Sequence, residues 1–320
     1  MKRHSFLQRL LESFTFIIRA RRFFISLCFN YNTRIKGKCR LFGDDCELRN
    51  SHIFPKFVID YFKETGSRFL RTFKEPNRRQ QDGLKRHFLS EKAEQRFSIN
   101  EKWFAENIFK PYLKQQRIIF EYDEHLFYFA ISLLWRILVL KLEENIKESD
   151  PNFSLLKNTE EEWRYFLSSY RYPMNSDKIF IWLTDSVVSH TIDAKGVDYF
   201  LTRQIDGTWV SNEKGTYLAV YGKFLRFIFW AELKSEESYD REDLLIHARK
   251  GKIIVPQNFN DIRMGNFILN RIEEIQNWPL TNEKQQEKIM NEIMKNPDAF
   301  INSDAGRAII NDFENLDPKA

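Results

Sequence analysis

Apolar side chains recur at helical spacing in several long stretches of this chain. Between residues 92 and 112 the apolar stripe consists of Ala93, Phe97, Phe104 and Ile108. A period near 3.6 residues is typical of a helix that buries one face. Helices are also predicted over residues 123–147, 159–168, 258–275 and 282–295.

Between the helix predicted to end at residue 168 and the one predicted to begin at residue 258, the pattern changes to that of β-strands. Runs rich in β-branched and aromatic residues are separated by turn signals such as Asp206-Gly207 and Gly215, which is typical of an antiparallel meander. The runs cover residues 178–184, 198–202, 208–210, 216–221 and 224–231. Nearer the N-terminus, two close turns over residues 34–53 predict a small hairpin, and a short helix follows Pro55.

The whole pattern predicts an α+β fold with two domains. Residues 1–115 would form a hairpin-and-helix domain, and residues 116–320 a domain of helices and antiparallel strands. With 42% hydrophobic and 15% aromatic residues, the chain can bury a sizeable core. Residues 5–29 also have helical spacing; packing against the core is the default interpretation, with a partner-binding or membrane-surface helix as alternatives.

The charge of the chain is mildly basic. A net charge of +5 is compatible with a polyanionic partner but does not identify one. One basic cluster consists of Arg78, Arg79, Lys85 and Arg86. Contact with phosphate groups and simple exposure to solvent explain this cluster equally well.

Cysteine usage and hydropathy predict a cytoplasmic protein. Three cysteines give no even-numbered disulfide framework, and no secretory signal is recognised. The longest apolar run, residues 126–140, contains Arg136 and is shorter than the roughly 20 residues of a membrane span. It therefore predicts a buried core helix and no transmembrane segment.

Two short motifs point to a specific chemistry. Ser51-His52-Ile53-Phe54-Pro55 places a histidine thirteen residues after Cys39, and Leu89-Ser90-Glu91-Lys92-Ala93-Glu94 follows. In this order they resemble the HNH-type (ββα-metal) nucleases, in particular a bacterial subgroup with the pattern SHIxP…LCxxCE, over roughly residues 37–140. The zinc-binding positions of that family correspond to Cys39, Phe42, Ser90 and Ala93. One thiolate of four remains, so no structural zinc is expected.

The resemblance implies a set of functional residues. His52 would be the general base that activates water for attack on a phosphodiester. Asp82 and Glu94 would complete the catalytic set and hold Mg²⁺ or Mn²⁺. Glu101 lies roughly 10 Å further along the same helix and is expected to support the site without binding the ion. The residues that would contact DNA or RNA are Arg78, Arg79, Lys85 and Arg86.

Simpler explanations exist for the same residues. The Ser90 hydroxyl can cap a helix, and Glu94 in a first turn complements the helix dipole, without any catalytic role. Apolar residues such as Phe42 and Ala93 at former ligand positions indicate a retained fold but say nothing of retained catalysis.

Two function hypotheses follow. The first is an HNH-like nuclease or nuclease-derived subunit that acts on nucleic acid; by analogy with the family, it would work in a bacterial phage-defence system beside a partner protein of a defence complex. The second is a catalytically inactive module that docks a partner protein or nucleoprotein.

Overall fold

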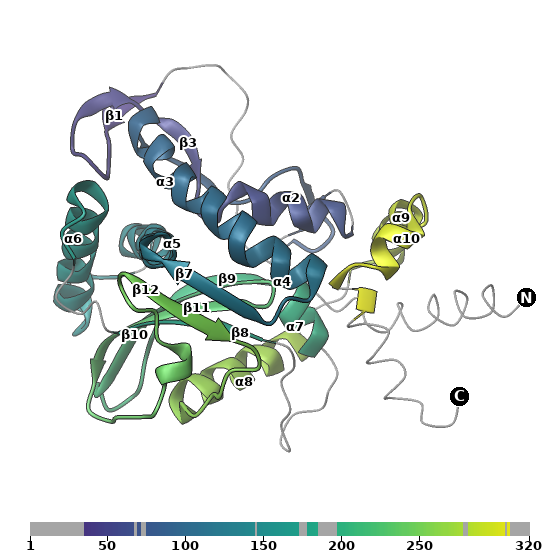
Figure 1. Cartoon of the computed structure of the whole chain (residues 1–320). Helices are drawn as coiled ribbons and strands as arrows, with labels where there is room; N and C mark the ends of the chain where they lie inside the picture. The colour runs from purple at the N-terminus through teal and green to yellow at the C-terminus, as the bar shows by residue number, and fades with distance from the viewer. Residues whose placement is uncertain are drawn as a thin grey trace, which may run out of the picture.

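The computed structural model describes residues 35–66, 69–71, 75–144, 146–172, 178–184, 197–277, 281–304 and 306–307. Helices and antiparallel strand pairs share this part of the chain, which confirms the α+β class (Figure 1). The helix predicted over residues 5–29 lies outside the described residues.

The N-terminal part contains two strand pairs and the helix that follows them. β1 (Lys36–Lys38) and β2 (Asp45–Glu47) form the predicted hairpin, and Gly43 in its turn has a φ of +77°, which glycine adopts without strain. β3 (Arg49–His52) pairs with β6 (Lys85–Leu89), and β6 leads into α3 (Glu91–Phe104). Between β3 and β6 lie α2 (Lys56–Glu64), β4 (Leu70–Arg71) and β5 (Arg79–Gln80).

The long helix predicted over residues 92–112 is confirmed, with one irregular turn. After α3 come a π-helical turn, η1 (Ala105–Phe109), and α4 (Lys110–Gln115). Pro111 has no N–H to donate to the preceding turn, and the π-helical turn lies just before it. The chain then forms β7 (Ile119–Asp123), which pairs with β12 (Lys250–Ile254).

α5 (Glu124–Glu144) is the central helix. Every residue from Leu126 to Leu140 is buried, and α6 (Phe153–Ser169) packs beside it. Among the described helices, α5 alone is long and apolar enough to cross a membrane. However, 83% of its most apolar window is buried inside the protein, as expected of a core helix.

The largest sheet has the strand order β8–β11–β10–β9 and is fully antiparallel. Its strands are β8 (Ile179–Leu183), β9 (Ile205–Ser211), β10 (Tyr217–Phe224) and β11 (Phe227–Ser235). Alternate residues of β10 serve opposite faces. Leu218 and Val220 join the core around α5, whereas Ala219 and Tyr221 pack with Met264 of α8 (Ile262–Gln276). Helices therefore cover both faces (Figure 1).

One predicted strand is wrong. Residues 198–202 belong to α7 (Val197–Arg203), although their aromatic and β-branched composition favours a strand. Phe200 and Leu201 are both buried in the cluster that contains α8, and this packing overrides a weak strand preference. The remaining elements are η2 (Glu242–Leu244), α9 (Glu283–Ile293) and α10 (Pro297–Ile301).

The predicted boundary between residues 115 and 116 falls at the end of α4. Buried side chains on both sides of it, from Cys39 to Val255, form one continuous core. Phe104 of α3 stacks on Phe129 of α5, with ring centroids 4.1 Å apart, and lies 5.8 Å from Phe229 of β11. The packing therefore continues from the N-terminal helix through α5 to the sheet.

Contact between α5 and the sheet depends on glycine. A Cβ at Gly222 would lie 2.6 Å from Ile137 Cδ1, so we expect Gly222→Ala to lower the free energy of unfolding by about 1–3 kcal/mol. Ile137→Val removes the Cδ1 methyl group. Alone it should lower the free energy of unfolding by about 0.5–1.5 kcal/mol, but by much less when it is combined with Gly222→Ala. Urea denaturation of both single variants and the double variant measures this coupling.

Gly265→Ala is the matched control. Gly265 lies within α8 and a Cβ there would come no closer than 3.5 Å to Phe259, so this variant should be stabilised by about 0.5–1 kcal/mol. Equal effects of the two glycine substitutions would contradict the proposed contact.

Candidate active site

His52 and Asp82 form a hydrogen-bonded pair at one end of the β3–β6 ribbon. Nε2 of His52 lies 2.9 Å from Oδ1 of Asp82, which also accepts the N–H of Gly83. The second carboxylate oxygen, Oδ2, lies 2.5 Å from Nζ of Lys85. Because the strand register places His52 opposite Lys85, all three side chains meet where β3 ends and β6 begins.

The surroundings of this pair favour a neutral imidazole beside an ionised carboxylate. Burial lowers the pKa of His52 below 6.5, and the charges of Lys85 and Arg136 act in the same direction. The hydrogen bond with Asp82 opposes this shift without reversing it. Burial acts to raise the pKa of Asp82, but hydrogen bonds from Lys85, His52 and Gly83 outweigh it and hold that pKa well below its usual range.

The same hydrogen bond sets the tautomer of His52. An ionised Asp82 can only accept, so the proton of the neutral imidazole lies on Nε2 and the lone pair on Nδ1. Nδ1 has no hydrogen-bond partner in the described part of the chain, and 16% of the His52 side chain is exposed. The arrangement is that of a weak base with one nitrogen available.

Arg136 of α5 connects this pair to the core. Its Nη1 donates to the backbone oxygen of His52 at 3.2 Å and lies 2.8 Å from Oε1 of Glu101. Nε donates to the backbone oxygen of Ser132, and the guanidinium lies over the ring of Phe97. Glu101 of α3 therefore reaches the site through Arg136, as a supporting group.

The four positions that the resemblance aligns with zinc ligands lie around the start of α3. The backbone N–H of Ser90 donates to the sulfur of Cys39 at 3.3 Å, and the Ser90 hydroxyl accepts the N–H of Ala93. Cys39 and Ala93 are both buried. Phe42 packs against this core, with Nζ of Lys92 4.7 Å from its ring centroid. Packing occupies the place where the resemblance would put a metal.

Of the two expected metal ligands, Asp82 meets His52 but Glu94 does not. Glu94 lies in the first turn of α3, and its carboxylate makes no ion pair with a described residue. No three His, Cys, Asp or Glu side chains gather as a metal site among the described residues. Asp82 already accepts three hydrogen bonds and faces the ammonium of Lys85, so these donors as arranged do not fit Mg²⁺ or Mn²⁺.

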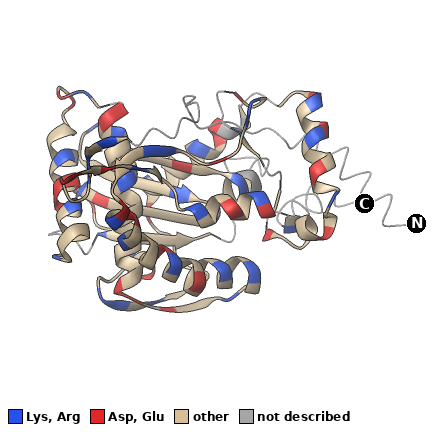
Figure 2. Ribbon diagram, turned by 90° about the horizontal axis from the view of Figure 1, so that it is seen from above, with Lys and Arg blue, Asp and Glu red and all other residues tan. Residues whose placement is uncertain are grey.

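The four basic residues predicted to contact nucleic acid differ in their partners. Lys85 pairs with Asp82, Arg78 with Glu75 at 3.1 Å, and Arg86 with Glu144. Arg79 lies 4.8 Å from the ring centroid of Phe69 and makes no ion pair within the described residues. Figure 2 shows Lys and Arg interspersed with Asp and Glu on the face seen from above. The cluster is thus largely neutralised by neighbouring acids.

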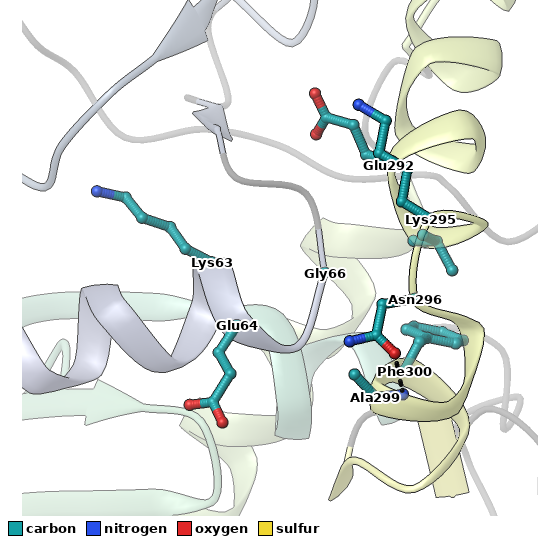
Figure 3. A pocket seen from close by; sticks show the side chains of 9 residues that line it. Lys63, Glu64, Gly66, Glu292, Lys295, Asn296, Ala299 and Phe300 are labelled. Carbon is teal, nitrogen blue, oxygen red and sulfur yellow. Dashed lines mark hydrogen bonds between the residues drawn. The ribbon is translucent and has the colours of Figure 1, made fainter.

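A pocket of about 290 Å³ lies elsewhere, between the end of α2 and the C-terminal helices (Figure 3). Lys63, Glu64 and Gly66 form one side, and Asn296 is on the other. The amide oxygen of Asn296 already accepts the N–H of Ala299 as the cap of α10. This pocket shares no residue with the His52–Asp82 pair.

Comparisons with models of known protein families, with curated protein sequences and with solved structures found no match to this chain. The HNH-like interpretation therefore rests on the residues and contacts of this chain.

The pKa of His52 predicts a pH effect on stability. As the pH falls below 6.5, His52 is protonated in the unfolded chain but stays neutral in the folded protein, where its pKa is lower. The free energy of unfolding therefore decreases with falling pH. The slope contributed is at most about 1.4 kcal/mol per pH unit. Asp82 acts in a separate window, because its contribution is lost only as the pH falls below about 4.

Urea denaturation at pH 7.5 and pH 5 tests this effect. Wild-type protein should lose more stability between the two pH values than His52→Gln, whose amide can still donate to Asp82. Parallel losses in the two proteins would show that His52 does not resist protonation.

Proposed function

We propose that this chain is a nucleic-acid-binding protein built on a zinc-less HNH-like ββα unit, with His52 as candidate general base for phosphodiester hydrolysis. The observation that supports this most directly is the His52–Asp82 pair at the end of the β3–β6 ribbon, which leads straight into α3. The free thiols of Cys39 and Cys46 are in keeping with a cytoplasmic location.

The proposed role of His52 follows from its protonation state. Nδ1 takes a proton from water as the water oxygen forms a bond to phosphorus, and the leaving oxygen departs with the electrons of the broken P–O bond. Asp82 holds the imidazole in the required tautomer and stabilises the imidazolium that forms. Arg79, which has no acidic partner among described residues, is the cation of the predicted cluster best able to meet a phosphate.

A second candidate function is supported by the engagement of Asp82. Because its carboxylate is occupied by Lys85 and His52, the unit would then be a catalytically inactive derivative that docks a nucleoprotein or a partner protein. A place in a phage-defence complex belongs to this proposal by analogy alone.

Substitution of His52 separates the two candidates. His52→Ala leaves the backbone oxygen bound by Arg136, and Asp82 keeps Lys85 and Gly83, so the loss of stability should be about 1 kcal/mol. Cleavage of labelled DNA or RNA, measured with and without Mg²⁺ or Mn²⁺, should fall by about 100-fold or more. The thermal midpoint, measured alongside, should change little.

His87→Ala provides the matched control. His87 lies on β6, is exposed, and has one ring nitrogen near the backbone oxygen of Leu48, so cleavage should be unaffected. If wild-type protein cleaves neither polymer with either metal, the docking function is the better one.

Restoring the lost thiols tests the HNH-like geometry itself. With native Cys39, the changes Phe42→Cys, Ser90→Cys and Ala93→Cys should create a tetrahedral site that binds one Zn²⁺ per chain. Co²⁺ titration should then give a tetrahedral thiolate spectrum, in a background with Cys28→Ser and Cys46→Ser. Adding Cys39→Ser should weaken metal binding. A folded triple variant that takes up no metal would show that these positions do not converge.

A further inference from the structure

The C-terminal end of α6 exposes three tyrosine rings, each beside an arginine. Tyr165, Tyr170 and Tyr172 are 50%, 54% and 40% exposed. Their ring centroids lie 5.6 Å from Arg171, 4.9 Å from Arg96 and 5.6 Å from Arg249, respectively. The arginines come from separate places in the sequence, so the fold assembles this set. We call these six residues the tyrosine–arginine surface.

Two of the three exposed rings, those of Tyr170 and Tyr172, stand on one buried aromatic base. Tyr170 packs against buried Tyr128 with centroids 5.3 Å apart, and Tyr172 packs against buried Phe166, also at 5.3 Å. Tyr128 and Phe166 are themselves in contact at 5.6 Å. The guanidinium of Arg96 also lies 5.5 Å from Phe42. A row of aromatic and guanidinium groups therefore runs from the β1–β2 turn across α3 to the end of α6.

Among the described residues, no acid neutralises the positive charges of this surface: Arg171 and Arg249 make no ion pair there. Arg96 donates to the backbone oxygens of Leu167 and Ser168, at the end of α6. These bonds hold Arg96 in place but leave its charge available, in contrast to the paired Lys85 and Arg86.

The backbone of Tyr170 gives a second observation. Tyr170 ends α6 with a φ of 60°, a left-handed conformation that favours glycine or asparagine and costs an ordinary residue about 1–2 kcal/mol. A large aromatic residue is unfavourable there on backbone grounds, and more than half of its surface remains outside the core. Backbone strain of this kind clusters at functional sites, although Gln116 and Leu225 also have a positive φ.

We propose that the tyrosine–arginine surface binds single-stranded nucleic acid. Unpaired bases stack on tyrosine rings and guanidinium planes, and unneutralised arginines meet the phosphates. A duplex keeps its bases stacked inside and can use only the charges. The inference deepens the proposed function by naming the form of the polymer, but binding at this surface requires neither His52 nor cleavage.

The proposal is tested by fluorescence anisotropy in EDTA, which measures binding of the full-length protein to labelled dT20, rU20 and a 20-base-pair duplex. Both single strands should bind more tightly than the duplex. Tyr170→Asn suits the left-handed backbone and removes the ring, so it should weaken single-strand binding by about 5-fold or more. Tyr170→Phe keeps the ring and should bind like wild type.

The charges are tested separately. The double variant Arg171→Gln/Arg249→Gln should weaken binding and reduce the slope of log K against log salt by about 1.4, since each phosphate contact on a single strand contributes about 0.7. Lys284→Gln/Lys288→Gln on α9, at the other end of the molecule from α6 (Figure 1), removes the same charge and should leave binding unchanged.

Three results would overturn the proposal. They are the absence of single-strand binding at 50 mM salt, equal affinity for the duplex, and wild-type affinity in both Tyr170→Asn and the double arginine variant. Anisotropy reports binding and not cleavage, so a failure of cleavage and a failure of strand binding are seen independently. If Tyr170→Asn does not fold, the arginine variant alone decides.

Discussion

One buried cation, Arg136, joins β3, which carries His52, to the helices α3 and α5. A buried guanidinium is costly unless its charge and its N–H groups are matched. Glu101 of α3 supplies the charge, and backbone oxygens of Ser132 in α5 and His52 in β3 accept hydrogen bonds from Nε and Nη1. Nη2 has no hydrogen-bond partner among the described residues. Losing one partner of such a buried pair costs about 3–5 kcal/mol. The end of β3, and therefore the ring of His52, is fixed to the most deeply buried helix of the protein.

The same attachment joins the N-terminal strands and α3 to the core of the whole protein. Small zinc domains need their metal because they bury too little apolar surface on their own, and the ion contributes on the order of 10 kcal/mol. Here Cys39, Ala93 and Phe97 belong to a core that continues to Val255. The N–H of Ser90 points at the remaining sulfur. Packing against α5 therefore supplies what a metal supplies in an isolated domain.

The sequence predicted features that depend on local pattern. Helical periodicity located α3, α5 and α8, and the meander was recognised from its turns. The motif around His52 and the turn at Asp82 identified two residues that do meet. Ser90 was recognised as a possible helix cap, and its hydroxyl does accept the N–H of Ala93. In each case the relevant contacts lie close together in the sequence or follow from a short motif.

The sequence could not predict features that depend on strand register or on distant contacts. His52 pairs with Lys85 at one end of the ribbon, whereas α3 begins at the other end, beside Arg49 and Leu89. Glu94, in the first turn of α3, therefore lies away from His52, and no periodicity reveals that separation. The ion pair between Arg136 and Glu101 joins residues 35 positions apart, and the contact between Arg96 and Tyr170 joins residues 74 positions apart.

The two candidate functional regions are linked by α3. Arg96 and Phe97 are consecutive residues, so their side chains leave the helix about 100° apart. Arg96 contributes to the tyrosine–arginine surface, and Phe97 lies beneath Arg136, which holds His52. A ligand that ordered the side chain of Arg96 would thus act on the same helix that supports His52. Because α3 is anchored in the core through Phe104, the tyrosine–arginine surface and His52 share one support, even though neither requires the other.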